Sequence, residues 1–116
     1  MRSQVTAQGI ESEFEMNSYR MRMMNFRGSV MVNLCDEEVL GKTLVEGSLK
    51  VEITNGYFGE NRVNDEEALQ LLRKSDIANL VGERIVSKAI DERLADPRAV
   101  RRIDGVPFLM IFKFST

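Results

Sequence analysis

The residue types that most often carry out catalysis are scarce in this chain. Histidine is absent and cysteine occurs once, as Cys35, so neither a hydrolytic triad nor a thiolate metal site can be built from the usual residues. Cys35 precedes three acidic residues, whose charge disfavours a reactive thiolate even where a helix N-terminus favours one. The acidic runs at 36–38 and 65–67 suit hard cations, but they also suit the first turn of a helix. We therefore expect no metal, no cofactor and no catalytic residue.

Two groups of basic residues are more informative, because few acids lie beside them. The glycine-rich segment 55–64, between the two groups, places Tyr57 near Arg62, and a ring beside a cation can hold an unpaired RNA base. If both groups lie on one sheet face, they predict a single patch for an RNA backbone. Alternatively, the arginines keep strand edges soluble and Tyr57 packs in the core. The two groups are Arg20, Arg22 and Arg27, and Arg98, Arg101, Arg102 and Lys113.

Length and charge limit the kind of protein that this chain can form. A chain of 116 residues with 43% hydrophobic and 29% charged residues is expected to be one globular domain that folds without disulfides. The net charge of −2 provides no overall basic field, so any nucleic-acid contact must be local. The apolar run 106–112 is too short to span a membrane, and residues 1–17 lack the apolar segment of a signal peptide. With its single cysteine, the chain is predicted to be cytoplasmic and to make no membrane contact.

The elements that must position these residues follow from the spacing of apolar side chains. Residues 1–17 lack periodicity and are expected to form a flexible tail, followed by a single α+β domain over 18–116. A capping pair, Asn64 and Glu67, predicts a helix that begins at residue 65. Alternating and apolar runs predict about five strands, at 19–26, 30–35, 47–54, 99–103 and 106–114.

Short connections join these strands. A loop around Gly28 makes a hairpin of the first two strands, and the Asp-Gly pair at 104–105 makes a hairpin of the last two. Residues 36–42 are expected to form one helical turn that Asp36 caps and Gly41 ends. The predicted fold is a mixed or antiparallel sheet of about five strands packed against two helices, in the order β-β-short α-β-α-α-β-β.

The segment 77–86 contains a glycine within an apolar pattern. Its apolar residues recur at helical intervals, which predicts a second helix over about 76–94. Gly82 falls inside the apolar face of that helix, so close approach of the helix to the sheet is the expected reason for it. Asn79 and Glu83 lie four residues apart, and they would then hydrogen-bond to each other at the edge of the core or face a ligand there.

One protein family resembles the chain over essentially residues 20–114. The chain contains, in this order, the runs VNLCDEEVLGKTLVEGSLKVEI, YFGENRV, EEALQLLRKSDIANLVGERIV and IDGVPFLMIFKF. In sequence and spacing these runs resemble the archaeal domain of unknown function family 424. The resemblance implies an archaeal cytosolic protein suspected of binding RNA in the translation apparatus, and it assigns no catalytic residue. The positions that match the family's motifs residue by residue are Cys35, Asp36, Gly41, Lys42, Asn79, Gly82, Glu83 and Arg84.

Three classes of function are compatible with these features. The first is a non-enzymatic RNA-binding module associated with a ribosomal subunit or translation factor, with arginines on phosphates and Tyr57 stacked on a base. The second is a protein-interaction or assembly module that uses an exposed strand edge or the methionine-rich first strand. The third is a small enzyme that uses Glu83 with Asn79 or Cys35. We expect the first class, because no pair of base and nucleophile can be named for the third.

Overall fold

The structure is a computed structural model, and it describes residues 18–59 and 61–113. The predicted tail, 1–17, therefore lies outside the described residues. The described strands are β1 (Tyr19–Phe26), β2 (Ser29–Asp36), β3 (Thr43–Glu46), β4 (Leu49–Glu52), β5 (Asn61–Val63), β6 (Ile77–Val81), β7 (Arg101–Ile103) and β8 (Val106–Phe112). The described helices are α2 (Asn55–Phe58), α3 (Asp65–Lys74) and α4 (Glu83–Asp91), with short 3-10 turns η1 (Glu37–Val39) and η2 (Pro97–Ala99).

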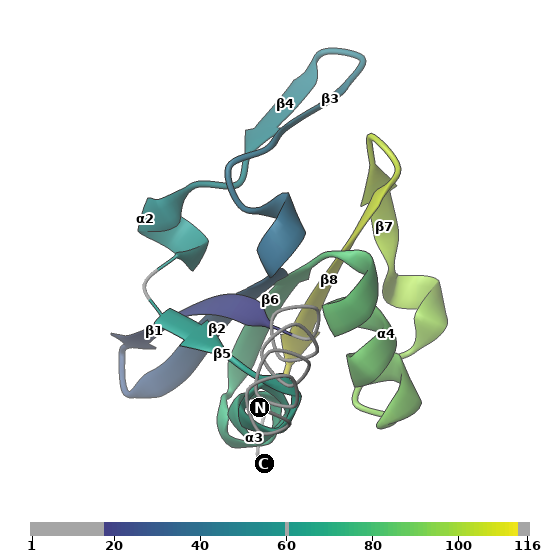
Figure 1. Ribbon diagram of the computed structural model, residues 1–116. Helices are drawn as coiled ribbons and strands as arrows, with labels where there is room; N and C mark the ends of the chain where they lie inside the picture. Colours follow the sequence, from purple (N-terminus) through teal and green to yellow (C-terminus); the bar gives the residue numbers. More distant parts are fainter. Residues whose placement is uncertain (1–17, 60, 114–116) are drawn as a thin grey trace, which may run out of the picture.

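Within these residues, six strands form one mixed sheet in the order β5-β1-β2-β6-β8-β7. The strands β3 and β4 form a separate hairpin that extends away from this sheet (Figure 1). Neighbouring strands of the large sheet are antiparallel except β2 and β6, which are parallel. A parallel pair needs a crossover connection, and the chain between β2 and β6 supplies one that includes α3. The α+β class predicted from the sequence is confirmed.

One face of the large sheet is covered by α3 and α4. Because side chains alternate along a strand, Leu34, Leu80 and Leu109 all lie on this face, and all three are buried. They pack with Leu72 of α3 and Ile85 of α4 in the larger hydrophobic cluster of the described residues. Burial of this apolar surface is the main stabilising contribution to the fold.

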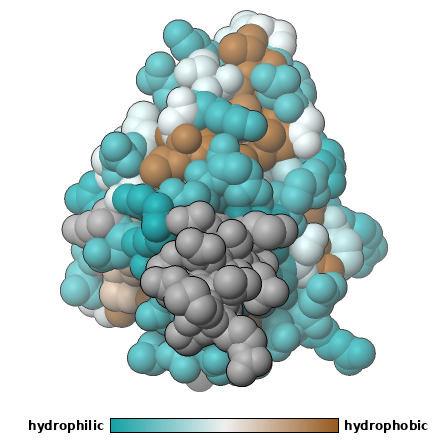
Figure 2. All heavy atoms as spheres, in the orientation of Figure 1, coloured by the Kyte–Doolittle hydropathy of each residue, from teal (hydrophilic) through white to brown (hydrophobic). Residues whose placement is uncertain are grey.

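The opposite face is covered at one end. There η1, α2 and the β3–β4 hairpin bury a second cluster around Cys35, Leu44 and Ile53, and Figure 2 shows hydrophobic side chains along and beneath this hairpin. Within residues 18–59 and 61–113, α2 reaches Arg22 and Asn33 on the remainder of this face, and no helix covers the rest, where Met110 is 54% exposed and Phe112 is 50% exposed. We call this remainder the open face, and its side chains are Arg22, Met24, Phe26, Met31, Asn33, Ile77, Asn79, Arg101, Phe108, Met110 and Phe112.

The predicted hairpins and the predicted capping box are confirmed. The turns at 27–28 and 104–105 connect β1 to β2 and β7 to β8, and all four turn residues have positive φ, as tight hairpin turns require. At the start of α3, the Glu67 N–H donates to the Asn64 side chain, and the Asn64 N–H donates to the Glu67 carboxylate, both at 2.9 Å. These short-range features depend on local sequence, which is why they could be predicted.

The helix predicted over 76–94 is wrong in its first part. Residues 77–81 form β6 in the middle of the sheet, and α4 begins at Glu83. A short apolar run fits a helical wheel and a buried strand equally well, so periodicity does not separate the two. Pairing with β2 on one side and β8 on the other decides for the strand, because every residue from 77 to 81 has a partner in both neighbours.

The strand predicted over 47–54 is correct in type but shorter, and it belongs to the separate hairpin rather than the main sheet. Leu49–Glu52 pairs with β3, a strand that was not predicted. The loop predicted over 55–64 contains the single-turn helix α2 and the edge strand β5. The main sheet therefore has six strands within the described residues, where about five were expected in total.

Gly82 forms the turn between β6 and α4, so its predicted place in a helix packed on the sheet is wrong. Its φ of +124° lies in the region that favours glycine, and a Cβ there would lie 2.4 Å from Cγ of Asp36. Asp36 does not cap η1 as predicted. Its carboxylate instead accepts the N–H groups of Arg84, at 2.8 Å, and Ile85, at 2.9 Å, which are free donors at the start of α4. The glycine thus leaves space for a carboxylate from β2 to cap the next helix.

Candidate functional site

Strand register distributes the predicted arginines over both faces of the sheet. Residues directly paired on neighbouring strands share a face. Arg22 pairs with Asn33, Asn33 with Asn79, and Asn79 with Met110, so these side chains form a row across the open face. The same alternation places three further arginines on this side of the sheet, namely Arg20, Arg62 and Arg101.

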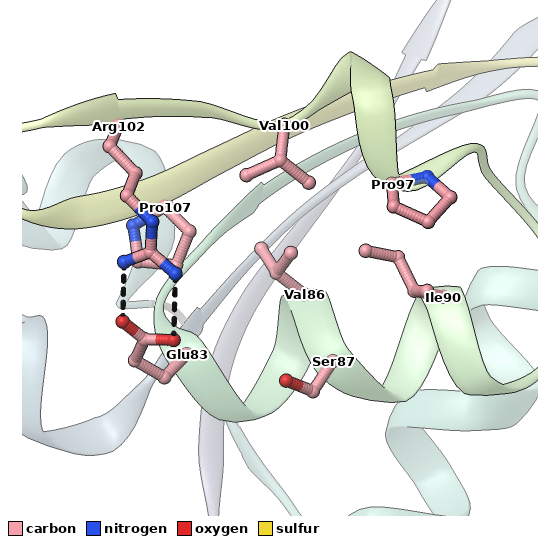
Figure 3. Close-up of a pocket in the computed structure, with 8 residues that line it drawn as sticks. All are labelled: Glu83, Val86, Ser87, Ile90, Pro97, Val100, Arg102 and Pro107. Carbon is pink, nitrogen blue, oxygen red and sulfur yellow. Dashed lines mark hydrogen bonds and ion pairs between the residues drawn. The ribbon is translucent and has the colours of Figure 1, made fainter.

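Arg102 lies on the opposite face, so the two basic groups do not form the single patch considered from the sequence. Its guanidinium is paired with the Glu83 carboxylate at 2.6 Å, beside a pocket between α4 and β7 (Figure 3). This ion pair holds the pKa of Glu83 below its usual range. Asn79 faces the other side of the sheet, so the predicted hydrogen bond between Asn79 and Glu83 is not formed. The small-enzyme hypothesis therefore loses the pairing of Glu83 with Asn79.

A groove of about 450 Å³ lies on the open face, between α2 and β4 on one side and β7 and β8 on the other. Tyr57 lines it and is 64% exposed, so this ring does not pack in the core, whereas Phe58 is half-buried against the second cluster. The described residues that line the groove are mostly apolar, with Arg101, Glu52 and Asn79 as polar exceptions. A single ligand in the groove can therefore contact aromatic rings, the Arg101 guanidinium and the Asn79 amide.

The amide groups of Asn33 and Asn79 connect β2, β6 and α2. Asn79 Nδ2 donates to Asn33 Oδ1 at 2.8 Å, and Asn33 Nδ2 donates to the main-chain carbonyl of Tyr57 at 3.0 Å. This chain of hydrogen bonds fixes α2 over the sheet and positions the Tyr57 ring beside the groove. Asn33 is 5% exposed, so it acts through Tyr57 and Asn79 rather than at the surface.

The arginines on this side of the sheet differ in how far they are already engaged. Arg20 and Arg62 both pair with the Glu37 carboxylate, at 3.6 and 3.1 Å respectively. Arg22 donates to the main-chain carbonyl of Gly56 in α2. Arg101 is exposed, and among the described residues no acid or carbonyl partners it. Arg101 is therefore the cation of the groove that is most available to an anion.

The remaining basic candidates lie elsewhere. Arg27 sits in the first hairpin turn with its guanidinium 5.4 Å from the centroid of the Phe26 ring. Lys113 follows β8, and its ammonium donates to the carbonyl of Leu72 near the end of α3, where a cation is favourable. Arg98 pairs with Asp96 at 2.8 Å in η2. None of the three lines the groove.

Several of the residues that match the family motifs have a structural role in the fold. Cys35 is fully buried, and burial together with the Asp36 and Glu37 charges raises the pKa of its thiol to about 12. Gly41 follows Leu40, the C-cap residue of η1, with a φ of +89° that favours glycine, and Lys42 is exposed beside it. Burial raises the pKa of the Asp36 carboxyl, while the two N–H groups of α4 that it accepts oppose that shift.

Arg84 joins the start of β1 to η1 and α4. Its guanidinium pairs with Glu38 at 2.5 Å, donates to the carbonyl of Ser18 at 3.0 Å, and lies 4.8 Å from the centroid of the Tyr19 ring. Tyr19 in turn donates to Asp65 at 2.5 Å, and burial followed by that carboxylate raises the pKa of the phenol. The network connects the start of β1 to η1, α3 and α4, and it lies away from the groove.

Reasoning from the sequence missed Asn33, Phe108 and Met110 as parts of the candidate site. An amide within the apolar strand segment VMVNLC was the available signal for Asn33, because a polar side chain buried in a sheet needs a partner. Phe108 and Met110 gave no comparable signal, since their exposure depends on which strands surround β8.

Comparison with known proteins identifies the family but no activity. No curated protein matches the chain. The chain is similar to the crystal structure of an uncharacterized conserved protein from Methanopyrus kandleri, with a TM-score of 0.71 and 20% identity over 85% of this chain and 96% of that one. That likeness supports the fold alone. Among the described residues, no helix is long and apolar enough to cross a membrane. Residues 24–114 match the family model described as protein of unknown function (DUF424), and the chain therefore belongs to this family.

Proposed function

We propose that this protein is a non-enzymatic RNA-binding module that binds single-stranded RNA across its open face. The observation that carries the proposal is the ring-lined groove with the unpaired cation Arg101 on an uncovered sheet face. Within the cell, the protein is an archaeal cytoplasmic component that associates with a ribosomal subunit or translation factor, as the resemblance to its family implies.

The geometry favours a strand of unpaired nucleotides over a duplex. Aromatic side chains in a groove stack on single bases, and each stacked base contributes about 1–3 kcal/mol without strong sequence preference. Tyr57 and Phe108 line the groove. Arg22 on β1 and Arg101 on β7 lie on opposite sides of Asn33 and Asn79 in the sheet. A chain with a net charge of −2 has to bind phosphates through such local cations.

A pair of adjacent arginines provides a matched test. Arg101 and Arg102 are neighbours in β7 but face opposite sides of the sheet, and both are exposed. We expect Arg101→Ala to weaken binding of a labelled RNA oligonucleotide, measured by fluorescence anisotropy. The logarithm of the association constant falls with the logarithm of the salt concentration, and we expect this variant to make that fall less steep by about 0.7. Arg102→Ala should leave both quantities unchanged. A wild-type slope near zero, or equal effects of the two variants, would refute phosphate binding by the open face.

Association with the translation apparatus needs a separate measurement. The native protein should sediment with a ribosomal subunit from cell extract, and Arg22→Glu should reduce that fraction because a reversed charge repels phosphate. Sedimentation that survives Arg22→Glu and Arg101→Ala together would point away from RNA contact through this face.

The β3–β4 hairpin favours a second candidate, a protein-interaction module. Val45 is 51% exposed and Leu49 is 37% exposed on an arm that extends from the body (Figure 1). Exposed apolar side chains on a projecting hairpin suit contact with a partner protein. Val45→Ser would weaken such a contact while leaving RNA affinity unchanged, so the two functions can be separated by the same set of assays.

A further inference from the structure

Asn79 presents a buried hydrogen-bond acceptor in the groove of the open face. It is one of the residues that line the groove, and its carboxamide oxygen, Oδ1, is buried without a partner among the described residues. Leaving a buried acceptor without a donor costs free energy, so most such atoms in folded proteins are satisfied. An unsatisfied acceptor at a ligand-sized groove is a position at which a ligand can supply the missing donor.

The neighbours of Asn79 fix which of its amide atoms is free. The carbonyl of Tyr57 only accepts, so Asn33 turns its Nδ2 toward it and its Oδ1 toward Asn79. Asn79 must then direct Nδ2 to Asn33, and the same nitrogen also lies 3.4 Å from the sulfur of Met31. Reversing either amide would place two acceptors against each other. Asn79 therefore presents a hydrogen-bond acceptor, and no donor, to a ligand in the groove.

An acceptor without an accompanying donor distinguishes among the bases of RNA. Adenine, cytosine and guanine carry an exocyclic amine, which donates, whereas uracil carries only a ring N–H between two carbonyl oxygens, which accept. Building on the RNA-binding function proposed above, we infer that the groove holds one unpaired base whose exocyclic amine, as in adenine, cytosine or guanine, donates to Oδ1 of Asn79. The asparagine thus gives base preference to a surface whose arginines alone would bind any sequence.

The surroundings of Asn79 suit this ligand. Tyr57 and Phe108 line the same groove and provide rings on which a base can stack. Met110 pairs directly with Asn79 across β6 and β8, and its unbranched side chain is 54% exposed, so it can move to admit a base to the buried oxygen. Arg101, which has no acidic partner among the described residues, lies at the same groove and can bind the adjoining phosphate.

The test compares RNA ligands that differ by the amine alone. Single-stranded oligonucleotides of equal length are made with adenine or with unsubstituted purine, which lacks the exocyclic amine, and are titrated into the full chain by fluorescence anisotropy. We expect the adenine oligonucleotide to bind about three- to tenfold more tightly than the purine oligonucleotide, which is the effect of one hydrogen bond.

Two variants assign the preference to Asn79. Asn79→Ala should abolish the difference between adenine and purine, while Asn25→Ala, a change of the same type at an exposed position in β1, should preserve it. Equal binding of the adenine and purine oligonucleotides by the unaltered protein, with a normal salt slope, would overturn the inference and leave RNA binding intact. Absence of binding to every oligonucleotide would overturn both. A preference that persists in Asn79→Ala would also refute the role of Asn79.

Discussion

Replacing Gly82 with alanine is predicted to destabilise the fold through two separable effects. The φ of +124° and ψ of 154° place this residue in a region occupied almost only by glycine, and another residue there costs roughly 1–3 kcal/mol. The added Cβ would also lie 2.4 Å from Cγ and 2.5 Å from Oδ2 of Asp36, so the carboxylate must leave the start of α4. Loss of a helix cap costs about 1–2 kcal/mol, which brings the expected total to about 2–5 kcal/mol.

A double-mutant cycle with Asp36→Ala isolates the second effect. That variant removes the same cap, with an expected cost of about 1–2 kcal/mol. In the double variant the cap can be lost only once, so its destabilisation should fall short of the sum of the single variants by about 1–2 kcal/mol. The free energies of unfolding are measured by urea titration followed by far-ultraviolet circular dichroism, with linear extrapolation to water.

A second glycine serves as the control for backbone strain. Gly47 also has a positive φ, of +62°, but no atom lies within 4 Å of the Cβ that alanine would add there. Gly47→Ala combined with Asp36→Ala should therefore be additive to within about 0.5 kcal/mol. If Gly82→Ala is equally additive with Asp36→Ala, or if it destabilises the protein no more than Gly47→Ala does, the contact between Gly82 and the Asp36 carboxylate is not what the glycine protects.

Two further predictions follow from the titratable groups. Cys35 should resist a thiol-specific disulfide reagent at pH 8 in native buffer and react only on unfolding, because it is buried and its pKa is raised to about 12; labelling at the rate of a free thiol would contradict this. The Arg84 guanidinium lowers the pKa of Glu38 from its usual value of 4.5, so the stability from this pair is present above that value and is lost as the pH falls through the lower folded pKa. The difference in free energy of unfolding between the unaltered protein and Glu38→Gln, measured by urea titration, should therefore shrink on acidification below pH 4.5. A difference that grows would contradict a lowered pKa for Glu38.

Local features of this protein could be determined from its sequence because a few adjacent residues specify each of them. The capping box depends on Asn64 and Glu67, three positions apart, and the two hairpin turns depend on the residue pairs 27–28 and 104–105. The alternation in 19–26 and the apolar run that begins at 106 identified β1 and β8 for the same reason. The absence of histidine and the single cysteine also set limits on catalysis that need no structure.

Tertiary structure alone decided the features that depend on residues far apart in the chain. The run 77–81 satisfies a helical wheel and a strand alike, and only β2 and β8 on either side make it a strand. Arg101 and Arg102 are adjacent in sequence, yet their positions in β7 place one at the groove and the other beside Glu83. Gly82 is required by Asp36, which lies 46 positions earlier in the sequence. Such relations arise from strand order and register, which the sequence of one segment does not contain.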